Sequence, residues 1–230
     1  MYRSIFIDLD NTVWDFSQNS TDTFREIYEK YHFERYFDSF EQFFALYKKK
    51  NEELWMKYGN GQITKDNLNA IRYAYPFRQV DAYDEKLIHA YTEDYMRHIA
   101  LKKKLMPHVR EALEYLYANY DLYILSNGFR ELQTQKLRSS GVERYFKKVI
   151  LSEDIGVHKP NPIIYNFALS STQSILSTSI MIGDSWTTDM AGAQHAGMDH
   201  IYYNTQGDSI VRRPRPTYEI KEWLEIMRIL

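Results

Sequence analysis

Apolar residues along this chain follow two different spacings. Short, largely apolar runs occur at residues 4–7, 122–125, 148–151, 180–182 and 200–203. Runs of this length are typical of strands buried in a parallel sheet. Elsewhere apolar residues recur every three or four positions, which predicts amphipathic helices. The alternation of strands and helices from Pro107 onward predicts an α/β fold with a parallel sheet and right-handed connections.

The stretch between the first and second predicted strands is helical throughout. Four stripes at helical spacing mark it: Phe24, Ile27, Tyr28 and Tyr31; Phe40, Phe43, Phe44 and Tyr47; Leu68, Ile71 and Tyr75; Ile88, Tyr91 and Tyr95. Thr64 is expected to cap the third helix. Roughly 90 residues are too many for a loop. We therefore predict a Rossmann-like parallel-sheet core formed by residues 1–14 and 105–230, with an inserted α-helical domain at residues 15–104.

The second half of the chain predicts several more helices. Pro107 is expected in the first turn of one of them, where proline is favoured, with Val109, Leu113 and Leu116 on the buried side. Others are expected at about residues 130–139 and 161–169, and a terminal helix is expected from Thr217.

Composition excludes several classes of protein. The net charge of -2 gives no electrostatic reason to expect nucleic acid or a membrane as partner. No apolar run approaches the roughly 20 residues that a membrane span needs, and the absence of cysteine excludes disulfides and thiolate metal sites. No apolar leader precedes the first strand. We expect a cytoplasmic protein, monomeric or weakly dimeric, in which residues 212–216 form an extended surface connection.

Polar residues gather where the predicted strands end. They are Asp8 and Asp10, Ser126 and Asn127, Lys159, and Asp184 and Asp189. Because parallel strands point the same way, these positions meet at one edge of the sheet, which is where α/β folds bind ligands. Asp8 and Asp10 can converge on one small volume, since side chains alternate along a strand. Two carboxylates that close require a cation, a raised pKa or both.

In order and spacing, these residues resemble the four motifs of the haloacid dehalogenase (HAD) superfamily of phosphohydrolases. The motifs are Asp8-Leu-Asp-Asn-Thr12, Ser126-Asn-Gly128, Lys159-Pro160 and Gly183-Asp-Ser-Trp-Thr-Thr-Asp189. The similarity extends from residue 1 to about residue 205. It implies the HAD fold, with the helical insertion acting as a cap that closes over the site and selects the leaving group.

The resemblance also implies roles for the acidic residues. Asp8 would be the nucleophile that forms an aspartyl phosphate, and Asp10 would be the general acid and then the general base. Mg²⁺ would be held by the carboxylates of Asp8 and Asp184 and by the backbone carbonyl of Asp10. Asp189 is expected to orient Lys159 or a metal-bound water, or else to be an acid placed at a helix N-terminus.

Phosphate binding is implied for the two other motifs. The Ser126 hydroxyl and the amides of Asn127 and Gly128 would hold the phosphoryl oxygens. Lys159 would neutralise them as a point charge.

The substrate class follows from the acids and from a finer resemblance. Hydrolysis of a carbon-halogen bond needs neither an acid two residues after the nucleophile nor Mg²⁺, so Asp10 and Asp184 favour a phosphate ester over a haloacid. Residues 125–135, 141–146 and 152–157 resemble the bacterial pyrimidine 5′-nucleotidase branch. Trp14 or Trp186 could stack a base, or could simply pack within the fold.

Three hypotheses about function therefore stay open. The first is a Mg²⁺-dependent 5′-nucleotidase. The second is a phosphatase of a sugar or small-acid phosphate, of the N-acylneuraminate 9-phosphate or phosphoglycolate type. The third is a catalytically silent binding module, against which the intact Asp8, Asp10, Lys159 and Asp184 argue.

Overall fold

The computed structural model describes residues 1–205, 207 and 215–230. The chain divides into two compact units. One unit, here called the core unit, contains Met1–Phe16 and Lys103–Leu230, and the other, the helical unit, contains Ser17–Lys102.

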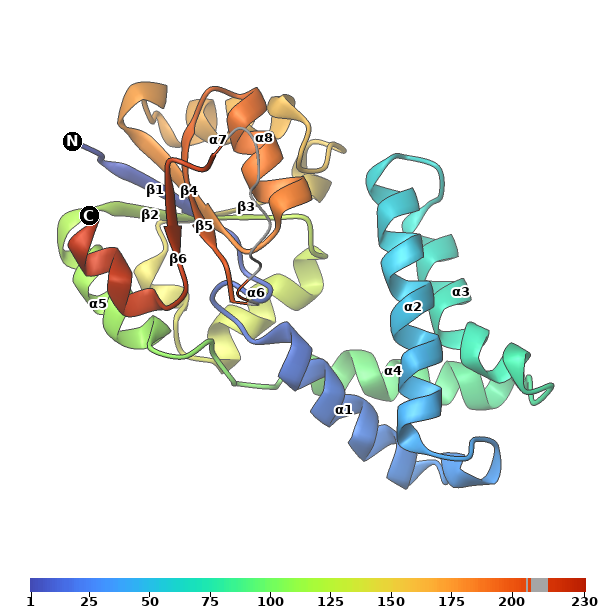
Figure 1. Cartoon of the computed structure of the whole chain (residues 1–230). Helices are drawn as coiled ribbons and strands as arrows, with labels where there is room; N and C mark the ends of the chain where they lie inside the picture. Colours follow the sequence, from blue (N-terminus) through green and yellow to red (C-terminus); the bar gives the residue numbers. More distant parts are fainter. Residues whose placement is uncertain (206, 208–214) are drawn as a thin grey trace. The chain divides into compact units, whose positions relative to one another are not determined.

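The core unit is built on a parallel sheet (Figure 1). In the described residues the sheet has six strands in the order β3-β2-β1-β4-β5-β6. The strands are β1 (Ser4–Ile7), β2 (Asp121–Ser126), β3 (Lys148–Leu151), β4 (Ser179–Gly183), β5 (Asp199–Tyr203) and β6 (Tyr218–Ile220). Ile7, at the end of β1, pairs with Ile124 of β2 and Ile182 of β4. The ends of the three central strands therefore lie side by side, as the sequence predicted.

Helices cover both faces of this sheet. α5 (Val109–Asn119) and α6 (Arg130–Ser139) lie on one face, and α7 (Pro162–Thr172) and α8 (Ala191–His195) lie on the other (Figure 1). Phe6 and Met181 point from the sheet into a buried cluster with Ile164 and Tyr165 of α7. The alternation of side chains along each strand thus supplies an apolar layer to each face.

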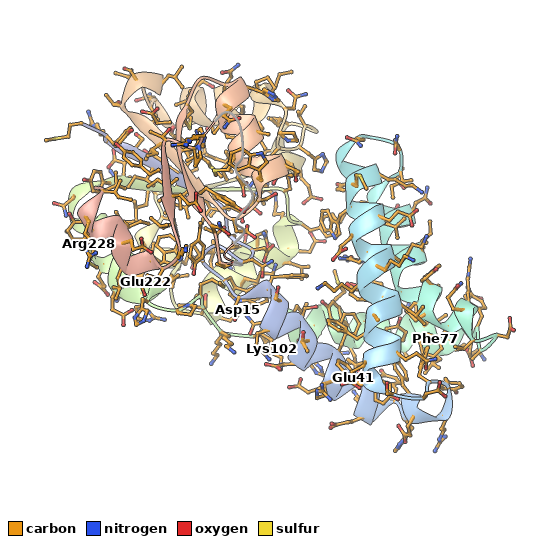
Figure 2. All side chains as sticks on the ribbon, in the orientation of Figure 1. Asp15, Glu41, Phe77, Lys102, Glu222 and Arg228 are labelled. Carbon is orange, nitrogen blue, oxygen red and sulfur yellow. The ribbon has the colours of Figure 1, made fainter. Side chains whose placement is uncertain are left out.

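The helical unit has an interior made largely of aromatic rings. Its helices are α1 (Phe16–Lys30, whose first residue belongs to the core unit), α2 (Phe40–Gly59), α3 (Lys65–Gln79) and α4 (Glu85–Ile99). Phe77, labelled in Figure 2, contacts the rings of Phe33, Phe37 and Tyr91. The predicted cap of α3 is confirmed, because the Thr64 hydroxyl accepts a hydrogen bond from the amide of Asn67.

Two predictions about helices of the core unit are wrong. The expected terminal helix from Thr217 is strand β6 followed by a 3₁₀ helix, Trp223–Arg228, whose last residue is labelled in Figure 2. Ile220 is buried at the edge of the sheet, so pairing with β5 outweighs the helical pattern of the residues that follow. Pro107 precedes α5 rather than lying in its first turn, because His108 is the capping residue.

One predicted stripe in the helical unit is also displaced. Ile71 of α3 is 38% exposed, whereas its neighbours Arg72 and Tyr73 are buried. The Tyr73 ring and the Arg72 side chain occupy the interior at this level, and Ile71 faces outward.

Across residues 1–205, 207 and 215–230, no helix has the length and apolar character needed to cross a membrane. Of the predicted surface connection at residues 212–216, the first three positions lie outside the described residues, and Arg215 is exposed.

Candidate active site

Asp8 lies directly beyond β1 and continues its pairing. The Asp8 amide donates a hydrogen bond of 2.9 Å to the carbonyl of Ile182 in β4, so this residue is held in the register of the central strands. The chain then turns at Asn11, whose φ of 62° is a left-handed conformation that asparagine tolerates well. The turn returns Thr12 to the side chain of Asp8.

Three carboxyl groups meet at the ends of β1 and β4. Asp8, Asp184 and Asp189 each place one carboxylate oxygen within 4.8 Å of those of the other two. Asp8 and Asp184 therefore lie within reach of one shared divalent ion, the relationship on which the sequence interpretation depended. A set of donors made only of oxygen fits a hard cation such as Mg²⁺.

Burial makes negative charge costly here. It raises the pKa of Asp8 to about 7, although the attraction of Lys159 acts in the opposite direction. Burial, followed by repulsion from Asp8 and Asp189, raises the pKa of Asp184 to about 8. A divalent ion bound between these groups would remove the repulsion, so the residues present fit the metal that the sequence implied.

The Thr12 hydroxyl joins the two carboxylates proposed to hold the ion. Its Oγ1 atom lies 3.3 Å from Oδ2 of Asp8 and 3.2 Å from Oδ1 of Asp184. The same oxygen accepts a hydrogen bond from the backbone amide of Asp184 at 3.1 Å. Thr12 ends the first motif, and its sequence context alone indicates no role for it.

Lys159 supplies a buried positive charge next to the carboxylates. Its Nζ atom donates to Oδ1 of Asp8 and Oδ1 of Asp189, each at 2.6 Å, and to the carbonyl of Leu125 at 2.7 Å. Burial alone lowers the pKa of an ammonium, but the attraction of Asp189 and Asp8 outweighs it, and the pKa of Lys159 is raised. This lysine is therefore charged, with all three of its hydrogens used.

Asp189 contacts both Lys159 and the backbone at the start of its own turn. One carboxylate oxygen accepts from Lys159, and the other accepts from the amide of Ser185 at 3.1 Å. The turn that carries it, Trp186–Met190, is a single π-helical turn. A Cβ atom at Gly183 would lie 2.3 Å from Oδ2 of Asp189, so the last residue of β4 has to be glycine for this carboxylate to fit.

The loop after β2 contains the residues expected to bind phosphate. The Asn127 side chain is engaged with Lys159: Nδ2 donates to the lysine carbonyl at 3.0 Å and Oδ1 accepts from its amide at 2.8 Å. This side chain therefore anchors the lysine loop. The Gly128 amide donates to Oγ of Ser126 at 3.1 Å, so in this structure it is directed at the serine.

Asp10 is not a member of this group of three carboxyl groups. Its Oδ1 atom accepts a hydrogen bond of 2.6 Å from Nζ of Lys136, and its Oδ2 atom accepts one of 2.9 Å from Nε2 of Gln133. Gln133 and Lys136 are buried, and both belong to α6, which the sequence pattern does not connect with the site. Their spacing of three residues puts them on one face of the helix. That helix contains only two leucines in ten residues, so part of its buried face has to be polar.

The two tryptophans differ in exposure. Trp14 is fully buried, and Nζ of Lys136 lies 4.6 Å from the centre of its ring. This ring packs within the core unit, which is the structural alternative given above. Trp186 is half-buried and contacts Tyr202 edge-on, with ring centres 5.5 Å apart.

Comparison with known proteins identifies the family of this chain. A sequence model described as haloacid dehalogenase-like hydrolase matches residues 2–197. The chain belongs to this family. The predicted HAD fold and superfamily are thereby confirmed, and the protein is a hydrolase.

Relatives and a solved structure resemble the chain over its whole length. HAD-hydrolase YfnB of Bacillus subtilis is 30% identical, and the match covers 100% of this chain and 95% of the relative. Pyrimidine 5′-nucleotidase PynA of Streptococcus pneumoniae is 27% identical, with 100% and 95% covered. Pyrimidine 5′-nucleotidase YjjG of Escherichia coli is also 27% identical, with 98% and 96% covered. A magnesium-bound crystal structure of YfnB superimposes with a TM-score of 0.87 at 28% identity, covering 99% of this chain and 98% of that one.

Proposed function

We propose that this hydrolase is a Mg²⁺-dependent phosphatase that uses Asp8 as its nucleophile and nucleoside 5′-monophosphates as substrates. The observation that carries the proposal is the group of three carboxylates, Asp8, Asp184 and Asp189, with the ammonium of Lys159 against two of them. Oxygen donors for a hard cation and a fixed positive charge for a phosphoryl group thus lie together at the Asp8 carboxylate.

The reaction divides into two transfers at phosphorus. A carboxylate oxygen of Asp8 attacks phosphorus while the bond to the leaving oxygen breaks, and Asp10 gives that oxygen a proton. Water then attacks phosphorus in the aspartyl phosphate while Asp10 takes a proton from it, which releases phosphate and restores Asp8. Mg²⁺, held by the carboxylates of Asp8 and Asp184 and the Asp10 carbonyl, would lower the charge repulsion between phosphate and carboxylate.

Ser126 and Lys159 are proposed to hold the phosphoryl oxygens. The Ser126 hydroxyl already accepts hydrogen bonds from Gly128 and Gln133, so its remaining capacity is that of a donor. Lys159 would exchange one of its carboxylate contacts for a phosphoryl oxygen, while Asp189 keeps its ammonium group in place.

The preference for nucleotides is supported by PynA and YjjG, both of which match nearly the whole chain. We propose that the helical unit, Ser17–Lys102, is the cap that selects the leaving group. We also infer a small-molecule phosphate ester, rather than nucleic acid or a membrane, as the partner of a cytoplasmic enzyme. A sugar or small-acid phosphate is the alternative substrate.

A substrate panel tests the proposal. Phosphate release would be measured from dUMP, dTMP, UMP and several sugar phosphates, with Mg²⁺ and with EDTA, for the wild type and for Asp8→Asn. We expect turnover of nucleotides that requires Mg²⁺ and the Asp8 carboxylate. Fast turnover of a sugar phosphate with no turnover of nucleotides would replace the substrate class. Wild-type activity in Asp8→Asn would refute the nucleophile.

A further inference from the structure

The carboxyl group of Asp10 is held from one side by a single helix. Both of its oxygens accept a hydrogen bond from α6, one from Lys136 and one from Gln133. The side chain of Asp10 is 28% exposed while that of Lys136 is 3% exposed. The two contacts therefore fix the rotation of the carboxyl group and leave its other side open. Each oxygen keeps a second lone pair on which a proton can be carried.

Gln133 also ties Asp10 to the phosphate-binding loop. Its Nε2 atom donates one hydrogen to Asp10 and the other to Oγ of Ser126, at 2.9 and 2.7 Å. The orientation of the amide follows from these partners, because a carboxylate paired with an ammonium only accepts. One planar group thus sets the distance between the proposed proton donor and the hydroxyl proposed to bind the phosphoryl group.

This arrangement of Gln133 does not serve packing alone. Its Oε1 atom is buried, and no hydrogen-bond donor in the described part of the chain reaches it. A buried acceptor without a donor destabilises a fold. A Cβ atom at position 128 would lie 2.3 Å from Nε2, so Gly128 is also required to make room. The two contacts of Nε2 explain why an amide is present at this buried position.

Lys136 is fixed by aromatic rings as well as by Asp10. Its Nζ atom lies 4.6 Å from the centre of the Trp14 ring and 5.3 Å from that of Phe16. These rings attract the cation and exclude water around it. In the described part of the chain, the hydrogen-bond acceptor of this ammonium is the Asp10 carboxylate.

We propose that Gln133 and Lys136 are positioning residues that aim the Asp10 carboxyl group at the leaving-group oxygen. The inference rests on the proposed function, because it assumes that Asp10 transfers the proton. It adds that the geometry of this transfer is set by α6 of the core unit and by the Ser126 contact.

Leaving groups that differ in their need for a proton provide the test. A para-nitrophenolate leaves without protonation, whereas an alkoxide needs a proton as the bond to phosphorus breaks. The value of kcat/KM would be measured with para-nitrophenyl phosphate and with a simple alkyl phosphate for the wild type, Gln133→Met and Lys136→Met. This parameter covers the steps up to release of the first alcohol, so hydrolysis of the aspartyl phosphate does not affect it.

We expect both variants to lose about 10²-fold with the alkyl ester and only a few-fold with the nitrophenyl ester, in line with the usual contribution of general acid catalysis. Effects on phosphate binding cancel in the ratio of the two values. Arg138→Met is the matched control, because it removes from the same helix a cation that pairs with Glu143 rather than with Asp10. Its ratio should equal that of the wild type.

The outcomes separate the two proposals. Equal losses with both esters, in variants that unfold at the wild-type temperature, would show that α6 supports the fold or the site charge without aiming Asp10. Gln133→Met keeps the site charge and fills the same space, so it remains informative if Lys136→Met unfolds. A wild type that cleaves neither ester in the presence of Mg²⁺ would refute the proposed function instead.

Discussion

The ammonium nitrogen of Lys159 lies 2.6 Å from Oδ1 of Asp8, although 151 positions separate the two residues in the chain. Both side chains are buried. A buried ion pair of this kind is demanding, because each charge lost its hydration when the protein folded. The pair is also coupled to Asp189, which accepts from the same ammonium. Stability and the proposed chemistry therefore depend on the same three groups.

Replacing the cation should strongly destabilise the core unit. Lys159→Met leaves Asp8 and Asp189 buried without their common partner, and removing one member of a buried pair costs about 3–5 kcal/mol. Urea unfolding in EDTA would measure the loss at about pH 9.5, because without Lys159 the pKa of Asp8 rises above its value of about 7 and protons neutralise the carboxylate at lower pH.

Lys147→Met is the control for that measurement. Lys147 pairs with Asp121 but is 58% exposed, and exposed pairs of this kind contribute little. An unfolding midpoint for Lys159→Met equal to that of the control would contradict a structural contribution from the buried pair.

The stabilising effect of Mg²⁺ should grow with pH. The pKa of Asp8 is about 7 and that of Asp184 about 8 in the folded protein, against an ordinary value of 3.8. The folded form therefore holds protons that the unfolded chain has released, and stability falls as pH rises from about 4 through about 8. Protons compete with the metal over the same range.

Thermal unfolding with and without Mg²⁺ measures this effect. The increase in Tm caused by Mg²⁺ should be small at about pH 6 and clearly larger at about pH 8.5. Asp184→Asn should remove most of the increase at both values. An increase that is independent of pH, or that survives in Asp184→Asn, would argue against metal binding by these carboxylates.

Removal of the Thr12 hydroxyl should weaken the binding of Mg²⁺. Thr12→Val removes the contacts to Asp8 and Asp184 and to the Asp184 amide while keeping the shape of the side chain. Loss of a group that orients metal ligands typically weakens binding about 10–100-fold. Titration with Mg²⁺, followed by Tm or by activity, would show the change.

Thr172→Val is the matched substitution, since the hydroxyl of Thr172 bonds within and beside α7. It should leave the apparent affinity for Mg²⁺ unchanged. If both variants bind the metal as the wild type does, Thr12 has only a packing role.

The meeting of Asp8 with Asp184 could be predicted from the sequence, because continuous apolar runs identify buried parallel strands and topology places their ends together. The edge strand β6 could not. Its three residues, Tyr218–Ile220, are too few to show a period of two, and the helical spacing after them is real. The edge of β5 that is open to pairing, which is known only from the tertiary structure, decides between strand and helix for these residues.

Gln133 and Lys136 were missed for a different reason. Polar residues three apart on a helix usually form a solvated face, and nothing local shows that this face is buried. A usable signal was the scarcity of apolar residues in α6, where only Leu132 and Leu137 are aliphatic. A helix that must cover a sheet with so few apolar residues has to bury polar ones, and those need polar partners.

The glycine that ends β4 should be intolerant of even one added carbon. In Gly183→Ala the new Cβ atom would lie 2.3 Å from Oδ2 and 2.4 Å from Cγ of Asp189. That carboxylate cannot easily move, because it is held by Lys159 and by the Ser185 amide. Overpacking of this type costs about 1–3 kcal/mol, and displacement of Asp189 should also release Lys159 and lower kcat.

Gly59→Ala provides the contrast within the same chain. Gly59 ends α2, and no atom lies within 4 Å of the position its Cβ would take, so alanine should stabilise by about 0.5–1 kcal/mol through its helix propensity. Urea unfolding and phosphate release would be measured for both variants. If Gly183→Ala keeps wild-type stability and kcat, Asp189 has an alternative position, and its contact with Lys159 is not required for the reaction.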